Sequence, residues 1–103
     1  METLHQLSHF FNRIQADPRI SVTHIGIYAA LIRYRQQNGT ESSFSVFARQ
    51  IMQIAKISSS STYHKCIREL YDYGYIGYEP SFNKTKGSKI SLPSLLINLE
   101  GVL

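Results

Sequence analysis

Residues 57–76, with the sequence ISSSSTYHKCIRELYDYGYI, decide the fold. A run of four serines and a threonine precedes Tyr63, Ile67 and Leu70, whose spacings of four and three place them on one face of a helix. Serine favours the start of a helix because its hydroxyl accepts a hydrogen bond from an unpaired backbone N–H group. Gly74 then supplies the residue type that most easily adopts the left-handed conformation after a helix. These residues predict a helix that begins in the serine run and ends before Gly74.

The opposite face of this predicted helix is polar and cationic. Once the apolar residues are buried, the helical period turns Ser61, His64, Lys65 and Arg68 outward. Free N–H groups at the helix start suit a phosphate oxygen, and the guanidinium of Arg68 matches the two acceptors of guanine. The alternative is that the serines only cap the helix and that Arg68 forms an exposed ion pair with Asp72. The candidate DNA-binding residues of this helix are Ser59, Ser60, Ser61, Thr62, His64, Lys65 and Arg68.

Two helices are predicted in the first forty residues. The first carries a single apolar stripe and ends at Asp17-Pro18. The second begins after the capping residues Ser21 and Thr23 and ends at Asn38-Gly39, and we expect it to be the most deeply buried helix. The stripe of the first helix consists of Leu4, Leu7, Phe10, Phe11 and Ile14, and the apolar face of the second consists of Ile25, Tyr28, Ala29, Leu31 and Ile32.

Between these helices and the serine run, residues 43–45 predict a brief edge strand, and a third, short helix follows. That helix is indicated by Phe47, Ile51, Met52, Ile54 and Ala55, and residues 55–58 predict a tight turn after it.

Downstream of Gly74, two strands flank a basic loop. Residues 75–79 are rich in aromatic and β-branched side chains, and residues 88–92 alternate so that Ile90 and Leu92 face inward and Lys89 outward. The loop 80–87 contains further lysines and Phe82, which is either a wedge between base steps or, more commonly, a ring packed under its own loop. The cationic candidates of this region are Lys84, Lys86 and Lys89.

The predicted order of helix, helix, short turn, helix, strand, basic loop and strand is that of a winged helix-turn-helix. Residues 57–76 resemble the recognition-helix signature of winged-helix regulators, in which serines and a threonine precede apolar residues at helical spacing and a Gly-apolar-Ile ending. They also resemble small winged-helix proteins of conjugative elements, phages and plasmids, some of which act in replication or excision. The resemblance covers roughly residues 44–92. The motif often has a glycine in its turn, where the nearest candidate here is Ser58.

Length and composition fit this interpretation. The 103 residues are 43% hydrophobic, which is enough for one domain with its own core. We divide the single domain 1–103 into an amphipathic helix (1–17), a helix-turn-helix (44–74), a wing (75–92) and a C-terminal extension (93–103), which fits either a helix or a strand. The net charge is +4, and residues 49–89 hold seven basic against three acidic residues, so the second half of the chain should attract a polyanion.

Other classes of site are not indicated. His5 and His9 lie one helical turn apart but have no third ligand nearby, so we expect no metal site and no cofactor. His64 and Cys66 point in different directions on a helix, and the acidic residues are scattered, so we expect no enzyme.

Cys66, as the single cysteine, excludes an internal disulfide and fits a buried position in a cytoplasmic protein. No apolar run is long enough to cross a membrane. The cluster Tyr71, Tyr73, Tyr75 and Tyr78 is expected to pack on the core rather than to stack on single-stranded bases.

We therefore expect a mainly α-helical winged helix-turn-helix protein with a small β-hairpin that binds double-stranded DNA and regulates transcription. The recognition helix would enter the major groove, and the wing would contact the backbone or the minor groove. One alternative is an accessory role in replication or excision of a mobile element, and another is a winged-helix module that binds a protein. The apolar stripe of residues 1–17 either forms a homodimer interface or covers the domain's own core, with help from Leu95 to Leu99.

Overall fold

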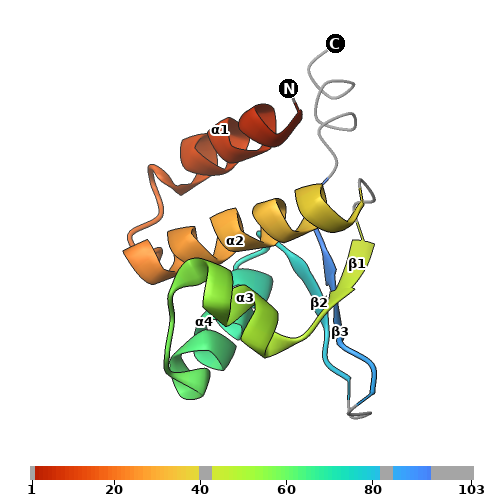
Figure 1. The fold of residues 1–103 in the computed structure, drawn as a ribbon. Coiled ribbons are helices and arrows are strands. Elements are labelled where there is room, and N and C mark those ends of the chain that lie inside the picture. The colour runs from red at the N-terminus through yellow and green to blue at the C-terminus, as the bar shows by residue number, and fades with distance from the viewer. Residues whose placement is uncertain (1, 40–42, 82–84, 94–103) are drawn as a thin grey trace.

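The computed structural model describes residues 2–39, 43–81 and 85–93, and this part of the chain forms four helices and a three-stranded antiparallel sheet (Figure 1). The elements are α1 (Glu2–Ile14), α2 (Val22–Asn38), β1 (Ser43–Val46), α3 (Ala48–Ala55), α4 (Ser60–Asp72), β2 (Gly77–Glu79) and β3 (Ser88–Ser91). The strand order is β1-β3-β2. The predicted fold class is confirmed: the chain is mainly α with a small β-hairpin, in an element order consistent with a winged helix-turn-helix. The expected C-terminal extension lies outside the described residues, apart from Pro93.

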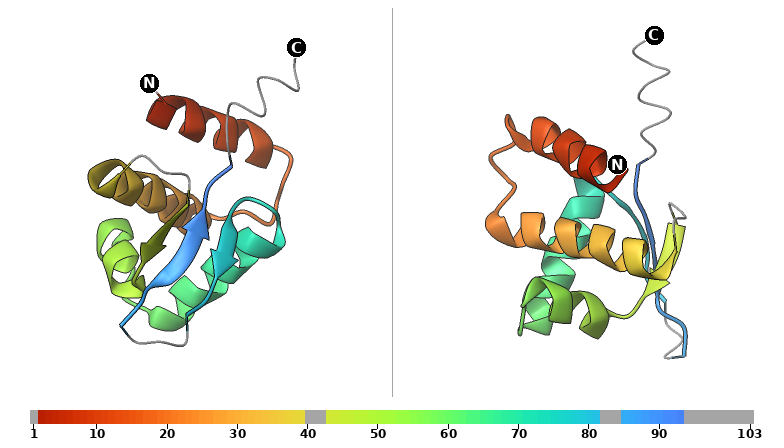
Figure 2. Two further views of the ribbon diagram at one scale, coloured as in Figure 1. Left: turned by 90° about the vertical axis from the view of Figure 1, so that its right-hand side faces the viewer. Right: turned by 45° about the horizontal axis from the view of Figure 1, so that its top comes forward.

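Helix α2 is the centre of the fold and contacts α1, α3 and α4. Figures 1 and 2 show α1 on one side of it and the pair α3 and α4 on the other. Because α2 is covered on both sides, its seven buried residues include Ile27 and Ala30 beside the predicted Tyr28, Leu31 and Ile32. Ser21 is the N-cap, as the sequence predicts, and its side chain accepts a hydrogen bond from the backbone N–H of His24. The predicted deep burial of this helix is confirmed.

Helix α1 is held on the domain by the inner part of its apolar stripe. Phe10 is 1% exposed and stacks on Tyr28 of α2, with 3.8 Å between the ring centroids. Gln6 is buried beside it, and its Nε2 donates to the Tyr28 hydroxyl at 3.3 Å and to the backbone carbonyl of Pro93 at 3.1 Å. Leu4 and Phe11, on the outer edge of the stripe, are 57% and 45% exposed. The stripe thus covers the domain's own core with one part, and the homodimer stays a prediction.

In the turn between α3 and α4, the left-handed residue is at a different position from the one that the sequence suggests. Lys56, rather than Ser58, adopts the left-handed conformation, with φ 62° and ψ 42°. This conformation ends α3, and the N–H groups of both Lys56 and Ile57 bond to the carbonyl of Met52. The role that a glycine often has in this motif is therefore taken here by a lysine, at the cost that a side chain brings to that conformation.

The end of α4 follows the predicted stop motif closely. Gly74 has φ 85°, its N–H bonds to the Tyr71 carbonyl at 3.0 Å, and the N–H of Tyr75 bonds to the Leu70 carbonyl at 2.9 Å. The expected strand 75–79 was too long at its start, because residues 75 and 76 complete this stop, and β2 begins at Gly77.

Pairing across the sheet sets which side chains face the helices. Ile90 of β3 lies between Phe44 of β1 and Tyr78 of β2, and it is fully buried. One residue earlier, Lys89 lies between Ser45 and Glu79 and is exposed. The predicted alternation of Lys89, Ile90 and Leu92 is confirmed, and β1 is an edge strand as expected.

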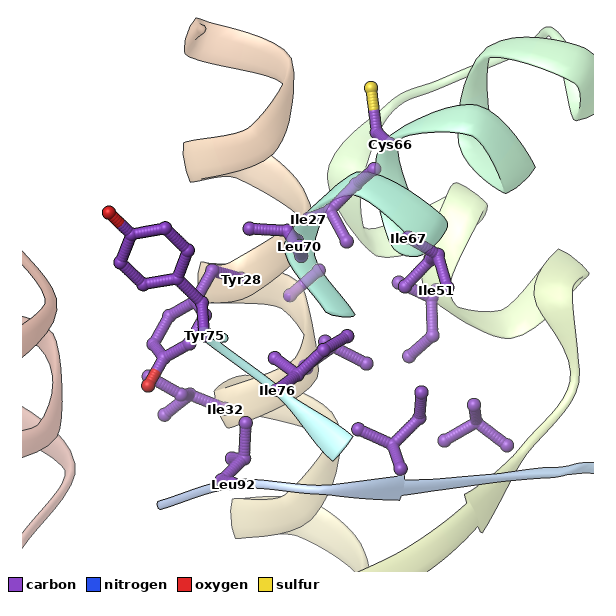
Figure 3. Close-up of a cluster of buried hydrophobic side chains, with 14 of the residues drawn as sticks. Ile27, Tyr28, Ile32, Ile51, Cys66, Ile67, Leu70, Tyr75, Ile76 and Leu92 are labelled. Atoms are coloured by element: carbon purple, nitrogen blue, oxygen red, sulfur yellow. The ribbon is translucent and has the colours of Figure 1, made fainter. Parts of the chain in front are cut away.

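The hydrophobic core lies where side chains of α2, α3, α4 and the strands converge (Figure 3). Ile27, Ile51, Ile67, Leu70 and Ile90 are fully buried there. Each such side chain contributes about 1.5–3 kcal/mol relative to an exposed one. Two of the five belong to α4, so core packing fixes the rotation of this helix and with it the direction of its polar face.

Candidate nucleic-acid interface

The start of α4 is capped by the serine run. Ser59 is the N-cap, and its hydroxyl accepts a hydrogen bond from the N–H of Thr62 at 3.2 Å. Ser60, Ser61 and Thr62 are exposed in the first turn. The capping role considered from the sequence is therefore real for Ser59, while its neighbours present their hydroxyls at the positive end of the helix dipole.

The polar face of α4 points outward as predicted. Ser61, His64, Lys65 and Arg68 are exposed, whereas the apolar residues of the helix are buried. His64 Nδ1 lies 2.8 Å from the Ser60 carbonyl oxygen, which can only accept, so Nδ1 carries the proton. Within the described residues Arg68 and Asp72 do not form the ion pair considered from the sequence.

This face also contains acidic groups. Lys65 and Arg68 line a shallow surface hollow together with His64, Glu69 and Asp72. Glu69 is partly buried because its carboxylate bonds to His24. The cationic character of the face is thus concentrated at Lys65 and Arg68 rather than spread evenly.

The hairpin of β2 and β3 carries the second group of cations. Lys86 and Lys89 are exposed and line a depression at the loop end of the hairpin, together with Ser45 and Phe47. The predicted site residue Lys84, like Phe82, lies outside the described residues. Arg49 was not recognised from the sequence: it is exposed at the start of α3, with its guanidinium 5.3 Å from the ring centroid of Phe47.

The two cationic groups lie at one end of the molecule. In Figures 1 and 2 the first turn of α4 and the far end of the β2–β3 hairpin both lie at the end opposite α1. α4 also contacts β2 directly, so the helix packs against the hairpin. The ribbon therefore places the start of α4 and the loop end of the hairpin at the same end of the molecule, although they come from separate segments.

The prediction that the tyrosine cluster packs on the core is confirmed for Tyr73, Tyr75 and Tyr78, but it is wrong for Tyr71, which is 49% exposed. Tyr75 is buried and its hydroxyl donates to Asp17 at 2.6 Å, and Tyr78 packs partly buried against the core. The Arg19 guanidinium lies 3.9 Å from the ring centroid of Tyr73. Hydrogen bonds from Arg19 and then from Tyr75 hold the pKa of the Asp17 carboxyl well below its usual range. These contacts secure the segment between α1 and α2 against the end of α4.

One group of possible metal ligands was missed from the sequence. His24, Cys66 and Glu69 each offer a ligand atom, and these atoms all lie within 4.8 Å of one another. His24 lies on α2 and the other two on α4. Cys66 is buried, as predicted, and burial followed by the charge of Glu69 raises the pKa of its thiol.

No protein-family model, curated protein or solved structure matches this chain. Among the described helices, none combines the length and the apolar character needed to cross a membrane.

Proposed function

We propose that this protein binds double-stranded DNA as a transcriptional regulator of the winged helix-turn-helix type. The observation that carries this proposal is that the first turn of α4, where its exposed polar face begins, and the loop end of the β2–β3 hairpin, which contains the exposed Lys86, both lie at the end of the molecule opposite α1. A duplex is the polyanion that such a helix and hairpin can contact together, the helix in the major groove and the hairpin on the backbone or in the minor groove.

The residues divide by the type of contact they would make. Arg68 has the planar fork for a guanine edge, and Lys65 beside it reaches a phosphate or a base. The exposed N–H groups and hydroxyls of Ser60 and Ser61 suit a phosphate at the helix start. Lys86 and Lys89 supply attraction that does not depend on sequence.

The test is fluorescence anisotropy with a duplex selected by this protein from random DNA, repeated over a series of salt concentrations. If about four phosphates are neutralised, log affinity falls against log salt with a slope of about −3.6. Arg68→Ala should cost about 1–3 kcal/mol at the selected site and relax the preference for its bases. Lys86→Ala with Lys89→Ala should weaken binding to all duplexes and reduce the slope by about 1.8. Arg33→Ala removes one exposed charge from α2 and serves as the control that should leave both quantities unchanged.

The outcomes separate the alternatives. Equal binding by the wild type and the α4 and hairpin variants would contradict the assignment of this surface. Selected sites confined to a replication origin or to the ends of a mobile element would favour the accessory role over regulation. A palindromic site would support the homodimer through α1. Failure to bind any duplex at low salt, with a protein partner recovered instead, would leave the protein-interaction module as the better proposal.

A further inference from the structure

A largely buried polar cluster joins the start of α2 to the middle of α4. None of its members is a proposed DNA-contacting residue, although Glu69 borders the hollow that Lys65 and Arg68 line. His24 Nε2 lies 2.9 Å from Glu69 Oε1, and the side chains of the two residues are 5% and 28% exposed. Cys66 lies one helical turn before Glu69 on the same face of α4, and the three ligand atoms lie within 4.8 Å of one another. Imidazole nitrogen, thiolate sulfur and carboxylate oxygen are the three donor types that Zn²⁺ uses in proteins. We propose that His24, Cys66 and Glu69 bind one Zn²⁺ or a similar thiophilic divalent cation, and this inference does not depend on DNA binding.

The positions are close to those that a tetrahedral site requires. Zinc bonds of about 2.0–2.3 Å place neighbouring ligand atoms roughly 3.3–3.8 Å apart. His24 Nε2 and Glu69 Oε1, 2.9 Å apart, therefore have to separate by about 0.4 Å, and the most distant pair of ligand atoms has to approach by up to about 1 Å. Glu69 is partly exposed, so its side chain can rotate to supply part of this change. The exposed side of Glu69 also gives the ion a route from solvent and leaves the fourth position to water.

The environment of His24 allows the tautomer that a metal needs. In the structure the backbone N–H of Ser21 donates to His24 Nδ1 at 3.0 Å, so the proton of the neutral ring is on Nε2 and is donated to Glu69. Binding a cation at Nε2 moves the ring proton to Nδ1. The Ser21 hydroxyl oxygen lies 2.9 Å from Nδ1 and can accept this proton, at the cost of the hydrogen bond from the Ser21 backbone N–H. Ligating histidines usually have such an acceptor on the second nitrogen.

The charges also balance. A neutral imidazole, a thiol and a carboxylate carry a charge of −1 together, and the cation displaces the thiol proton. The bound site then contains a doubly charged cation, one thiolate and one carboxylate, so it is neutral. Neutrality matters because an uncompensated charge at this depth carries a large desolvation cost. One proton is released to solvent for each cation bound.

The test uses the full chain and Co²⁺ as a spectroscopic probe, followed by competition with Zn²⁺. Because Cys66 is the single cysteine of the sequence, a thiolate-to-cobalt charge-transfer band reports on this residue alone. We expect one Co²⁺ per chain, a charge-transfer band, and loss of the band when Zn²⁺ is added. Cys66→Ser should abolish the band, and Glu69→Gln should weaken binding by at least about tenfold.

Two control variants make the result specific. Glu79→Gln changes an exposed carboxylate on β2 and should leave Co²⁺ affinity unchanged. His5→Gln with His9→Gln tests whether the histidines of α1 bind the ion instead, and the charge-transfer band should persist in this variant. A wild-type protein that binds Co²⁺ without the band, or that does not bind it, would overturn the proposal, and this readout does not require any variant to fold.

Discussion

Among the described glycines, Gly87 leaves the least room for a Cβ atom, so one added methyl group should have a large effect. A Cβ atom added at Gly87 would lie 2.4 Å from the carbonyl oxygen of Val46, 2.6 Å from its carbonyl carbon and 3.0 Å from its nitrogen. All three are backbone atoms of β1, so no side-chain rotation can relieve the contact. Gly87→Ala must therefore push β1 away from β3 at the pair Val46 and Ser88, where the hairpin joins the rest of the sheet. Overpacking of this kind costs about 1–3 kcal/mol of unfolding free energy.

The matched control is the same substitution at Gly26. There an added Cβ would have no neighbour within 4 Å, and the residue lies inside α2. Gly26→Ala should raise the unfolding free energy by about 0.5–1 kcal/mol, because alanine loses less backbone entropy in a helix. The two variants should thus shift the urea midpoint in opposite directions at unchanged m-value. A Gly87→Ala protein within about 0.5 kcal/mol of the wild type would show that β1 and β3 separate without cost and refute the reasoning.

Three further predictions concern the helices and their connections. In a urea titration, Phe10→Ala should lower the unfolding free energy by about 3 kcal/mol or more, because the ring is buried against α2. Phe11→Ala is the control at an exposed position and should change the unfolding free energy by less than about 0.5 kcal/mol. Ser59→Ala should cost about 1 kcal/mol by removing the N-cap of α4, and replacement by Asp should restore most of it. Asp17 has a lowered pKa in the folded state, so its contribution is present above the unfolded value of about 3.9 and is lost as pH falls below it. Asp17→Asn should therefore flatten the acid side of a plot of stability against pH, and an unchanged acid limb would contradict the lowering of the Asp17 pKa by its hydrogen bonds from Arg19 and Tyr75.

Local chemistry made the helix boundaries predictable. The Ser21 cap, the serine start of α4 and the stop at Gly74 each depend on hydrogen bonds between residues within a few positions of one another. The outward face of α4 was predictable for the same reason, since the 3.6-residue period relates Lys65 and Arg68 directly to the buried residues of the same helix.

Features that depend on contacts between distant segments were not predictable in this way. The left-handed turn residue is Lys56, a residue type with no preference for that conformation, because packing of α3 against α4 fixes the chain there. The guanidinium of Arg49 lies 5.3 Å from the ring centroid of Phe47, and Phe47 lies beside Lys86 and Lys89 only because β1 pairs with β3. Neither the turn at Lys56 nor the position of Arg49 follows from a helix or strand period, so the sequence pattern does not predict them.

The burial of His24 shows that a polar residue can lie in the interior when its helix is covered on two sides. In a helix with one apolar stripe, a histidine off the stripe faces water. Because α1 covers one side of α2 and α4 the other, both sides are interior, and His24 must satisfy both ring nitrogens inside the protein. Ser21 serves one nitrogen through a local contact, but the other is served by Glu69, 45 residues away. The same constraint that buries His24 also brings it to Cys66, so the ligand cluster is a consequence of α2 lying between two layers.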